Sequence, residues 1–513
     1  MVNEATRPRI GAATRDKIKS TIRKQLTSDP QLPRAKPTES LWQLPIAQDI
    51  GSIQSPRLPE KVDFAIIGSG VASCGVTRSL LTNSRSGNKT VGVFEARGLC
   101  SGATGRNGGQ LTRLPPTRHT FMAEEFGVEQ ANKVMRLTVR GLHEMHSLAE
   151  SQGPEFLAAT QKTRTEKFFA YFDEESWNET VEAVKLFEAE IPEEKGAYEL
   201  VSKEDTASVY NINGAYGGLR FPAGVCAPYR LVTGTFKSLM EKFPTRLSID
   251  SNTPIVSISH TSDEDYPYRL ETPRGTVKAA NVVHCTNGHA GHLIPGLRGK
   301  MYPRRGTMSV QSPGSQFPDL SSQQSWSFYF TPEHNPAVGD VETGRYYCFQ
   351  SKETGHLWIG GDRDSIDGFI SADDSCIDVH AEKNLRGVLP KLFSKNWVTG
   401  PGEVRGIWTG IMCYTGDQLP FIGRLPASVT LRQGNGEWIA GGWNTYGMTN
   451  GLLCGDALGK IILGEDVFSW FPESYIITEE RLGGQKFETE AVMEDYFKRI
   501  GATQYVDTRE SRL

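Results

Sequence analysis

The residues whose types and spacing could do chemistry begin with a glycine-rich run, Gly68 to Ala72, directly after the apolar stretch 62–67. In the spacing G-x-G-x-x-S, the first glycine permits a tight turn and the second lets the backbone approach a pyrophosphate. The helix predicted to follow, ending near Leu81, would present free N–H groups to the phosphates. A second predicted strand, 90–95, ends on Glu95, whose carboxylate can accept hydrogen bonds from ribose hydroxyls. The pattern predicts a dinucleotide site; the alternative is a tight glycine turn in an α/β core.

A second cluster of small and polar residues runs from Cys100 to Gln110. Its glycines, set among hydroxyl and amide side chains, suit a backbone that lies against a flat polar ligand. A nicotinamide cofactor has no use for such a segment directly after the ribose acid, whereas the ribityl chain and ring of a flavin extend from the same pyrophosphate. The sequence therefore favours a flavin dinucleotide. The residues predicted to contact it in these two runs and at the end of the second strand are Gly68, Ser69, Gly70, Val71, Ala72, Glu95, Ala96, Arg97, Ser101, Gly102, Ala103, Thr104, Arg106, Asn107, Gly108, Gly109 and Gln110.

The elements that must position these residues form an interrupted sheet. Strand-like runs recur along the chain, and the last of them leads into a helix near 449–463. The runs are 164–172, 255–259, 281–285, 344–350, 356–361 and 437–442. A parallel sheet that begins at residue 62 and ends near 442 must be interrupted by other segments of the chain.

Composition excludes several classes of protein. The 513 residues carry a formal net charge of −4, which gives no electrostatic reason to expect nucleic acid as a partner. No apolar run reaches the ~18 residues of a membrane span. The eight cysteines are scattered, and His289 and His292 lack a third ligand, so no disulfide scaffold and no metal are expected. Two windows, 68–109 and 441–459, hold 16 of the 53 glycines, which we interpret as cofactor-facing stretches.

Several motifs, in the same order, resemble those of the D-amino-acid oxidase / glycine oxidase / sarcosine oxidase (DAO) superfamily of FAD-dependent oxidoreductases. They are IIGSGVASCG with FEARGLCSGATGRNGGQ, LRFPAGVCAPYRLV (219–232), NTPIVSI (252–258), NVVHCTNGHAGHLIPGLRG (281–299), YPRRGTM (302–308), IWTGIMCYTGDQLPFIGRLP (407–426) and EWIAGGWNTYGMTNGLLCGDALGKIILG (437–464). The resemblance covers roughly 60–470 and is nearest to the branch that contains gamma-glutamylputrescine oxidoreductase.

The resemblance implies a fold of class α/β and α+β, in which a Rossmann-like FAD-binding domain is interleaved with an antiparallel-sheet substrate domain. The expected parts of the FAD-binding domain are 61–115, 225–300 and 400–470, and those of the substrate domain are 116–224 and 301–399. A basic, partly disordered arm, 1–60, would precede them, and a C-terminal helix and tail, 471–513, would follow.

The resemblance also implies further site residues. The additional cofactor contacts are Val256, whose backbone would meet adenine, Thr286, Asn287, Gly288, Gly423, Gly442, Asn444, Thr445, Tyr446, Gly447 and Met448. Four residues are candidates for a catalytic role beside the flavin: Arg106, Asn107, Arg305 and Tyr446. Tyr414 and Trp443 would add aromatic walls to the substrate site.

The implied reaction is oxidation of a C–N bond of a small-molecule amine or amino acid, with hydride passing to flavin N5. Oxygen would then accept the electrons and give hydrogen peroxide, unless another acceptor serves. FAD is expected to be non-covalent, because Cys413 lies off the position at which relatives attach the flavin. Two alternatives remain: a tailoring oxidase that acts on a nitrogenous secondary metabolite, and a flavin-binding protein without turnover.

The two ends of the chain carry signals of their own. Ile18, Ile22 and Leu26 share one face of a short basic helix predicted near 14–27. We expect a solvated arm; the alternatives are a targeting presequence and an arm that packs on the body through Trp42 and its neighbours. The chain ends Ser511-Arg512-Leu513, a variant of the S-K-L peroxisomal address read by an import receptor. Peroxisomal localisation is expected, with cytoplasm and mitochondrion as alternatives.

Overall fold

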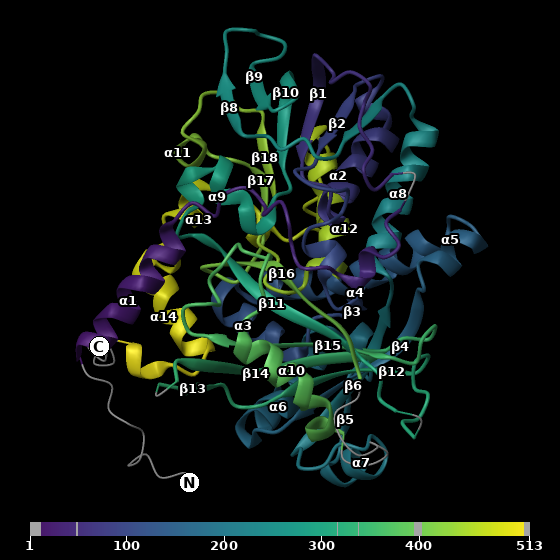
Figure 1. Cartoon of the computed structure of the whole chain (residues 1–513), viewed down its shortest axis with the longest axis vertical. Helices are drawn as coiled ribbons and strands as arrows, with labels where there is room; N and C mark the ends of the chain where they lie inside the picture. The colour runs from purple at the N-terminus through teal and green to yellow at the C-terminus, as the bar shows by residue number, and fades with distance from the viewer. Residues whose placement is uncertain (1–11, 48–49, 315, 337, 394–402, 507–513) are drawn as a thin grey trace.

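Two β-sheets organise the computed structural model, which describes residues 12–47, 50–314, 316–336, 338–393 and 403–506. In Figure 1 the smaller sheet, with β1, β2, β10 and β18, occupies the upper half, and the larger sheet, with β4, β12, β14 and β15, the lower half. Chain segments pass repeatedly between the two. The α/β and α+β fold class expected from the sequence is confirmed.

The smaller sheet has the order β17-β18-β10-β1-β2-β7, with the hairpin β8–β9 paired to β10. Its strands are β1 (Lys61–Ile67), β2 (Val91–Phe94), β7 (Leu247–Asp250), β8 (Ser257–His260), β9 (Tyr268–Thr272), β10 (Gly275–His284), β17 (Phe421–Arg424) and β18 (Glu437–Gly441). The run from β18 to β7 is parallel. Central parallel strands are covered on both faces, which explains why β1 and β2 are almost continuously apolar.

The larger sheet has the order β16-β11-β15-β14-β12-β4-β6-β3, with β13 added to β14 and β5 to β6. Its strands are β3 (Gln110–Leu111), β4 (Thr163–Tyr171), β5 (Glu199–Val201), β6 (Gly217–Val225), β11 (Met301–Gln311), β12 (Gln324–Tyr329), β13 (Glu333–Asn335), β14 (Asp340–Gln350), β15 (Leu357–Ser365) and β16 (Val404–Thr415). All pairings are antiparallel except β12 with β4.

Helices cover both sheets. They are α1 (Ala12–Thr27), α2 (Val71–Thr82), α3 (Pro116–Phe126), α4 (Val128–Glu150), α5 (Pro154–Ala159), α6 (Glu174–Glu190), α7 (Lys203–Ser208), α8 (Pro228–Lys242), α9 (Ala290–Leu293), α10 (Val379–Leu392), α11 (Ala427–Thr430), α12 (Gly447–Ile462), α13 (Glu479–Leu482) and α14 (Thr489–Arg499). Helix α2 packs on α12 and α8 beside the smaller sheet, and α10 packs on β11 and β15. Among the described residues, no helix is both long and apolar enough to cross a membrane.

The positions of β3 and β16 differ from the expected domain division. We expected 61–115 and 400–470 to belong wholly to the FAD-binding domain, yet β3 pairs with β6 and β16 pairs with β11 in the larger sheet. Local sequence cannot reveal this, because β16 is as apolar as a central strand of either sheet. The division of the remaining segments stays a prediction.

The described part of the N-terminal arm packs on the body of the protein, which corrects the expectation of a solvated arm and agrees with the alternative of a packed one. Partial disorder of the arm stays a prediction, because residues 1–11 lie outside the described residues. Helix α1 lies beside α14 in Figure 1. Ile22 and Leu26 are fully buried in a cluster that contains Tyr302 and Phe497. The predicted helix is therefore present, and its apolar face packs against the body of the protein.

Several glycines of α12 serve helix packing, which corrects their interpretation as cofactor-facing. A Cβ atom on Gly455 would lie 2.4 Å from the carbonyl oxygen of Ala72 in α2, and one on Gly75 would lie 2.2 Å from the carbonyl oxygen of Leu452. Gly459 likewise faces Ser79. The two helices approach so closely that no side chain fits between their backbones.

We therefore predict that Gly455→Ala destabilises the protein by about 1–3 kcal/mol, because the backbone oxygen of Ala72 cannot move aside without displacing α2. Chemical denaturation of both proteins measures the difference. Gly387→Ala in α10 is the matched control, because a Cβ atom there meets open space. Alanine in a helix should raise the free energy of unfolding by about 0.5–1 kcal/mol relative to glycine. Equal effects of the two substitutions would contradict the assignment.

Candidate active site

A cavity of about 650 Å³ lies between the carboxyl ends of β1, β2 and β10 and one face of the larger sheet. This edge of a parallel sheet is where ligands of α/β proteins bind. Most of the predicted cofactor residues line the cavity: Gly68, Ser69, Gly70, Val71, Ala72, Glu95, Ala96, Arg97, Gly102, Ala103, Thr104, Arg106, Asn107, Gly108, Gln110, Thr286, Asn287, Gly288, Asn444, Thr445, Tyr446, Gly447 and Met448. The structure thus brings segments separated by more than 300 positions to one site.

The first glycine loop is held by the acid that ends β2. Ser69 donates to the Glu95 carboxylate through its hydroxyl at 2.6 Å and through its N–H at 3.1 Å. Gly68 has a φ of +97°, a conformation that L side chains rarely adopt. A Cβ on Gly70 would lie 2.9 Å from Thr104 Oγ1, so a side chain there would crowd the loop. Glu95 therefore fixes the loop while its own carboxylate stays at the cavity wall.

The second glycine segment is shaped by its own amide side chain and by a buried lysine. Asn107 accepts from the N–H of Gly109 at 2.8 Å and donates to the carbonyl of Thr104 at 3.0 Å. Lys167 of β4, 1% exposed, donates to the amide oxygen of Gln110 and to the carbonyl of Trp326. Because lysine can only donate, the amide nitrogen of Gln110 faces the other way. Burial holds the pKa of the Lys167 ammonium well below its usual range.

The turn between β18 and α12 forms another wall. Asn444 and Thr445 both have positive φ, and Asn444 donates to Thr415 Oγ1 at 3.1 Å. The side chain of Asn287 accepts from the N–H of Gly442 at 3.1 Å, which ties this turn to the one after β10. Helix α12 then begins at Gly447, with the positive end of its dipole at the cavity.

Arg106 lines the cavity but does not present its guanidinium to a substrate, which corrects its assignment as a catalytic residue. Its Nε donates to the carbonyl of Thr409 at 2.6 Å, and its Nη2 donates to the carbonyl and the hydroxyl of Thr38. The residue is 2% exposed, and burial lowers the pKa of its guanidinium to about 10. Arg106 is a positioning residue that joins the second glycine segment to the N-terminal arm and β16.

Arg305 is placed away from the cavity, which corrects a second catalytic assignment. It forms a buried ion pair with Asp364, with Nη2 and Oδ2 3.0 Å apart. Its neighbour Arg304 lines the cavity instead and donates to the hydroxyl of Tyr414 at 3.2 Å. Successive side chains of a strand point to opposite faces, so one of the two arginines had to face the site. The sequence motif alone does not tell which.

Five predicted cofactor contacts lie off the cavity wall: Ser101, Gly109, Val256, Gly423 and Gly442. Val256 is exposed and its N–H bonds to Glu271, while the preceding Ile255 lines the cavity. A Cβ on Gly109 would lie 2.7 Å from the ring of Trp42, so glycine at this position makes room for the tryptophan of the N-terminal arm. Ser101 and Gly442 bond instead to neighbouring loops, and Gly423 belongs to the edge strand β17.

Sequence reasoning missed the cationic end of the cavity. Arg118 of α3 and Arg345 of β14 line it beside Tyr446 and Tyr329. Arg118 donates to the amide oxygen of Gln418 at 2.7 Å, and its buried Nε has no hydrogen-bond partner among the described residues. No local motif surrounds either arginine, so only the fold identifies them. Burial raises the pKa of the Tyr446 phenol, which therefore stays protonated.

The residues at the other end fit a flavin dinucleotide. The buried polar atoms of the cavity wall that have no hydrogen-bond partner among the described residues include Arg97 Nε, Gln110 Nε2 and Thr286 Oγ1. All three can donate, as phosphate and ring carbonyl oxygens require. The glycine loop can bind the pyrophosphate of FAD and Glu95 can bind its ribose, and these donors can bind further oxygen atoms of the cofactor.

The comparisons with known proteins agree. The family model described as FAD-dependent oxidoreductase (DAO) matches residues 63–461. The chain therefore belongs to the DAO family of FAD-dependent oxidoreductases, and it is an enzyme whose cofactor is FAD. The superfamily named from the sequence motifs is confirmed, whereas its branch stays a prediction.

Solved structures share the fold. Glycine oxidase from Geobacillus kaustophilus superposes with a TM-score of 0.61 at 17% identity, covering 82% of this chain and 99% of its own. L-proline dehydrogenase from P. horikoshii gives 0.57 at 18% identity over 82% and 98% of the two chains. L-α-glycerophosphate oxidase from Mycoplasma pneumoniae, solved with FAD bound, gives 0.57 at 15% identity over 79% and 96%.

One curated relative matches over a short stretch. The bifunctional tRNA 5-methylaminomethyl-2-thiouridine biosynthesis protein MnmC of Paracidovorax citrulli is 35% identical over 68 residues. These residues are 13% of this chain and 10% of that protein, so the match spans only a tenth of the relative's length.

We predict that acid precipitation of the holoenzyme releases all of the flavin into the supernatant. Cys285 and Cys413 line the cavity, but burial raises the pKa of both thiols, to about 12 for Cys285, so neither is a reactive thiolate. Absorbance of supernatant and pellet measures the partition. Yellow colour that stays in the pellet after washing would refute non-covalent binding.

Proposed function

We propose that this enzyme oxidises the C–N bond of an amine that also carries a carboxylate, and that oxygen accepts the electrons. Bound FAD would supply the two-electron acceptor for the hydride of the substrate α-C–H bond, the N–H proton would pass to water, and water would hydrolyse the resulting imine. Oxygen with two electrons and two protons gives hydrogen peroxide. The observation that carries the proposal is the pair of arginines at the cavity end remote from the glycine loop.

Arg118 and Arg345 are suited to bind an anionic group. No carboxylate of the described residues lies within ion-pair distance of either guanidinium, although both side chains line the cavity. Burial lowers the pKa of the Arg118 guanidinium to about 10, whereas Arg345 is exposed at the cavity. An unpaired guanidinium that is withdrawn from water, as that of Arg118 is, is costly unless a ligand supplies the opposite charge. A planar carboxylate matches the forked donors of arginine.

The other charges of the wall leave this cationic end uncompensated. Three acids line the cavity: Glu95 and Asp374 accept hydrogen bonds from Ser69 and Arg97, and Glu179 is exposed on α6. The expected substrate therefore brings its own negative charge.

The same cations would prepare the amine for reaction. Hydride leaves the α-carbon readily only when the nitrogen lone pair is free, so the substrate amine must lose its extra proton. Positive charges nearby lower the pKa of an ammonium group. Arg118 and Arg345 would thus orient the carboxylate and favour the neutral amine, while Tyr171, Tyr329 and Tyr446 exclude water.

Flavin reduction tests the proposal directly. The holoenzyme is mixed anaerobically with amino acids, N-methyl amino acids and polyamines, each amino acid paired with the amine that lacks its carboxylate. We expect amino acids to bleach the flavin faster than their decarboxylated partners, and air to restore the colour with release of peroxide. If no amine bleaches the flavin, the proposal fails and a tailoring role on another nitrogenous substrate gains support.

We predict that Arg118→Met and Arg345→Met each raise the KM for the best amino acid about 10- to 150-fold, the equivalent of about 1.5–3 kcal/mol for a hydrogen bond to a charged group. Steady-state kinetics measure the change, and the decarboxylated amine should show a much smaller one. Arg140→Met is the matched control, because Arg140 stacks on Trp470 at the surface. An equal rise in KM for the amino acid and for its decarboxylated partner would argue against carboxylate binding by these arginines.

Localisation remains a proposal, since Ser511-Arg512-Leu513 lies outside the described residues. We expect a fluorescent fusion that keeps this C-terminus to appear in peroxisomes, where peroxide is contained. Removal of the last three residues should disperse it into the cytoplasm. An unchanged punctate pattern would show that this tripeptide is not the address.

A further inference from the structure

The N-terminal arm crosses the mouth of the cofactor cavity. We call residues 29–45, which follow α1, the strap. Three of them, Gln31, Leu32 and Pro33, are part of the cavity wall. The family model begins only at residue 63, so nothing in that match accounts for the arm.

The strap lies at the end of the cavity where the adenosine of FAD is expected. Arg97 follows Glu95, the acid placed to bind ribose, and donates to the strap carbonyl of Arg34 at 3.2 Å. His289 Nδ1 lies 2.9 Å from the carbonyl oxygen of Gln31. Asp29 forms an ion pair with Arg298, with Oδ2 and Nη2 2.9 Å apart. The strap is therefore bonded to both sides of the adenosine end.

The C-terminal half of the strap is bonded to the flavin segment itself. Ser40 donates its hydroxyl to the carbonyl of Gly105 at 2.9 Å, and Gln43 donates to the same carbonyl at 3.0 Å. Thr38 accepts from Arg106, the positioning residue described above. Any displacement of the strap would disturb the backbone that lies against the cofactor.

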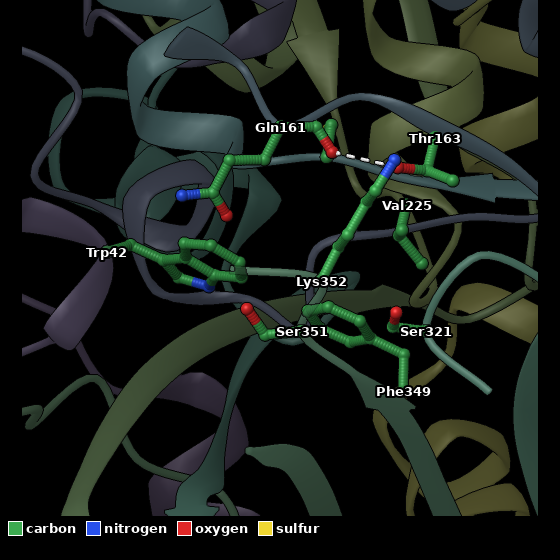
Figure 2. Close-up of a pocket in the computed structure, with 9 residues that line it drawn as sticks. Trp42, Gln161, Thr163, Val225, Ser321, Phe349, Ser351 and Lys352 are labelled. Carbon is green, nitrogen blue, oxygen red and sulfur yellow. Dashed lines mark hydrogen bonds between the residues drawn. The ribbon is translucent and has the colours of Figure 1, made fainter. Parts of the chain in front are cut away.

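Trp42 anchors the strap. Its ring stacks on Trp358 with centroids 3.7 Å apart, and its Nε1 donates to the carbonyl of Asn107 at 2.7 Å. Figure 2 shows Trp42 and Phe349 in the wall of a separate pocket of about 10 Å³, room for a single water molecule. Between this anchor and α1, residues 34–36 are exposed.

We propose that the strap is a third component of the cofactor site, which covers the adenosine of bound FAD, and that FAD enters and leaves only when the strap lifts. Helix α1 and Trp42 anchor the two ends of the strap. Between them, residues 34–36 are exposed and are held by one hydrogen bond from Arg97 and by an ion pair between Arg34 and Asp373, with Nε and Oδ2 3.2 Å apart. The strap can therefore open at its middle while both ends stay attached. When the strap returns to its closed position, Leu32 and Pro33 cover the adenosine from the solvent side.

Proteolysis of the unmodified chain tests the coupling between the strap and FAD. Trypsin can cut the exposed strap after Arg34, whereas the bond after Lys36 is protected by Pro37. If FAD binds only the closed strap, the open fraction falls by the factor 1 + [FAD]/Kd, so FAD at tenfold Kd should slow cleavage at Arg34 about tenfold. Peptide mass analysis over time gives the rates.

Cleavage after Lys195 is the internal control, because this residue is exposed outside the cavity wall. Global stabilisation by FAD would slow both cuts equally, whereas the proposal requires a selective effect at Arg34. Equal slowing, or no slowing at Arg34, would overturn it.

A variant pair tests retention of the cofactor. In the holoenzyme, Leu32→Gly should raise the rate of FAD dissociation after dilution by about tenfold, the equivalent of about 1.4 kcal/mol of lost contact, followed by flavin fluorescence. Lys36→Ala, in the exposed middle, should leave that rate unchanged. The apoprotein of each variant should unfold at the wild-type temperature. An unchanged rate for Leu32→Gly, or an equal rise for Lys36→Ala, would contradict the proposal.

Discussion

The buried carboxylate of Asp374 joins segments that are distant in the sequence. It accepts from Arg97 Nη1 at 3.1 and 3.0 Å and lies 3.7 Å from Arg106 Nε. The backbone oxygen of the same residue accepts from the N–H of Thr38 at 2.8 Å and from the hydroxyl of Thr409 at 3.2 Å. Loss of one partner from a buried charged group costs about 3–5 kcal/mol, so these contacts hold each other in place. The ribose end and the flavin segment depend on the carboxylate of Asp374, and the strap and β16 depend on its backbone oxygen.

The parts of the site that lie within one stretch of chain were predictable from the sequence. The order of strand, glycine loop, helix and Glu95 defines its own geometry, because the turn and the helix N-terminus follow from local backbone preferences. The motifs of the resemblance also identified the turns after β10 and β18, because each of these turns lies within one short stretch of sequence. What required the structure was the direction of side chains on strands and the contacts between distant segments, as Arg304 and Arg305 illustrate.

Glycine content was the least decisive of the sequence signals, because glycine serves several purposes. Gly68 supplies a positive φ at the cofactor loop, Gly455 lets two helices touch, and Gly109 makes room for Trp42. All three lie in windows with the same composition. Arg118 and Arg345 show the opposite case: they have no local signal, and become recognisable only because the fold places both at the cavity with no carboxylate of the described residues within ion-pair distance.

The arm also sets the order in which the protein can be completed. It is synthesised before its partners: Thr409 bonds to Thr38 across 371 positions, and Glu490 pairs with Arg23 across 467. Contacts of such sequence separation form late, since the intervening chain must be ordered first. The dinucleotide cradle between β1 and β2 is local and can form early. During synthesis the dinucleotide site would therefore stay uncovered. The arm could pack in its final position and cover the cofactor only after α14, against which α1 packs, had been made.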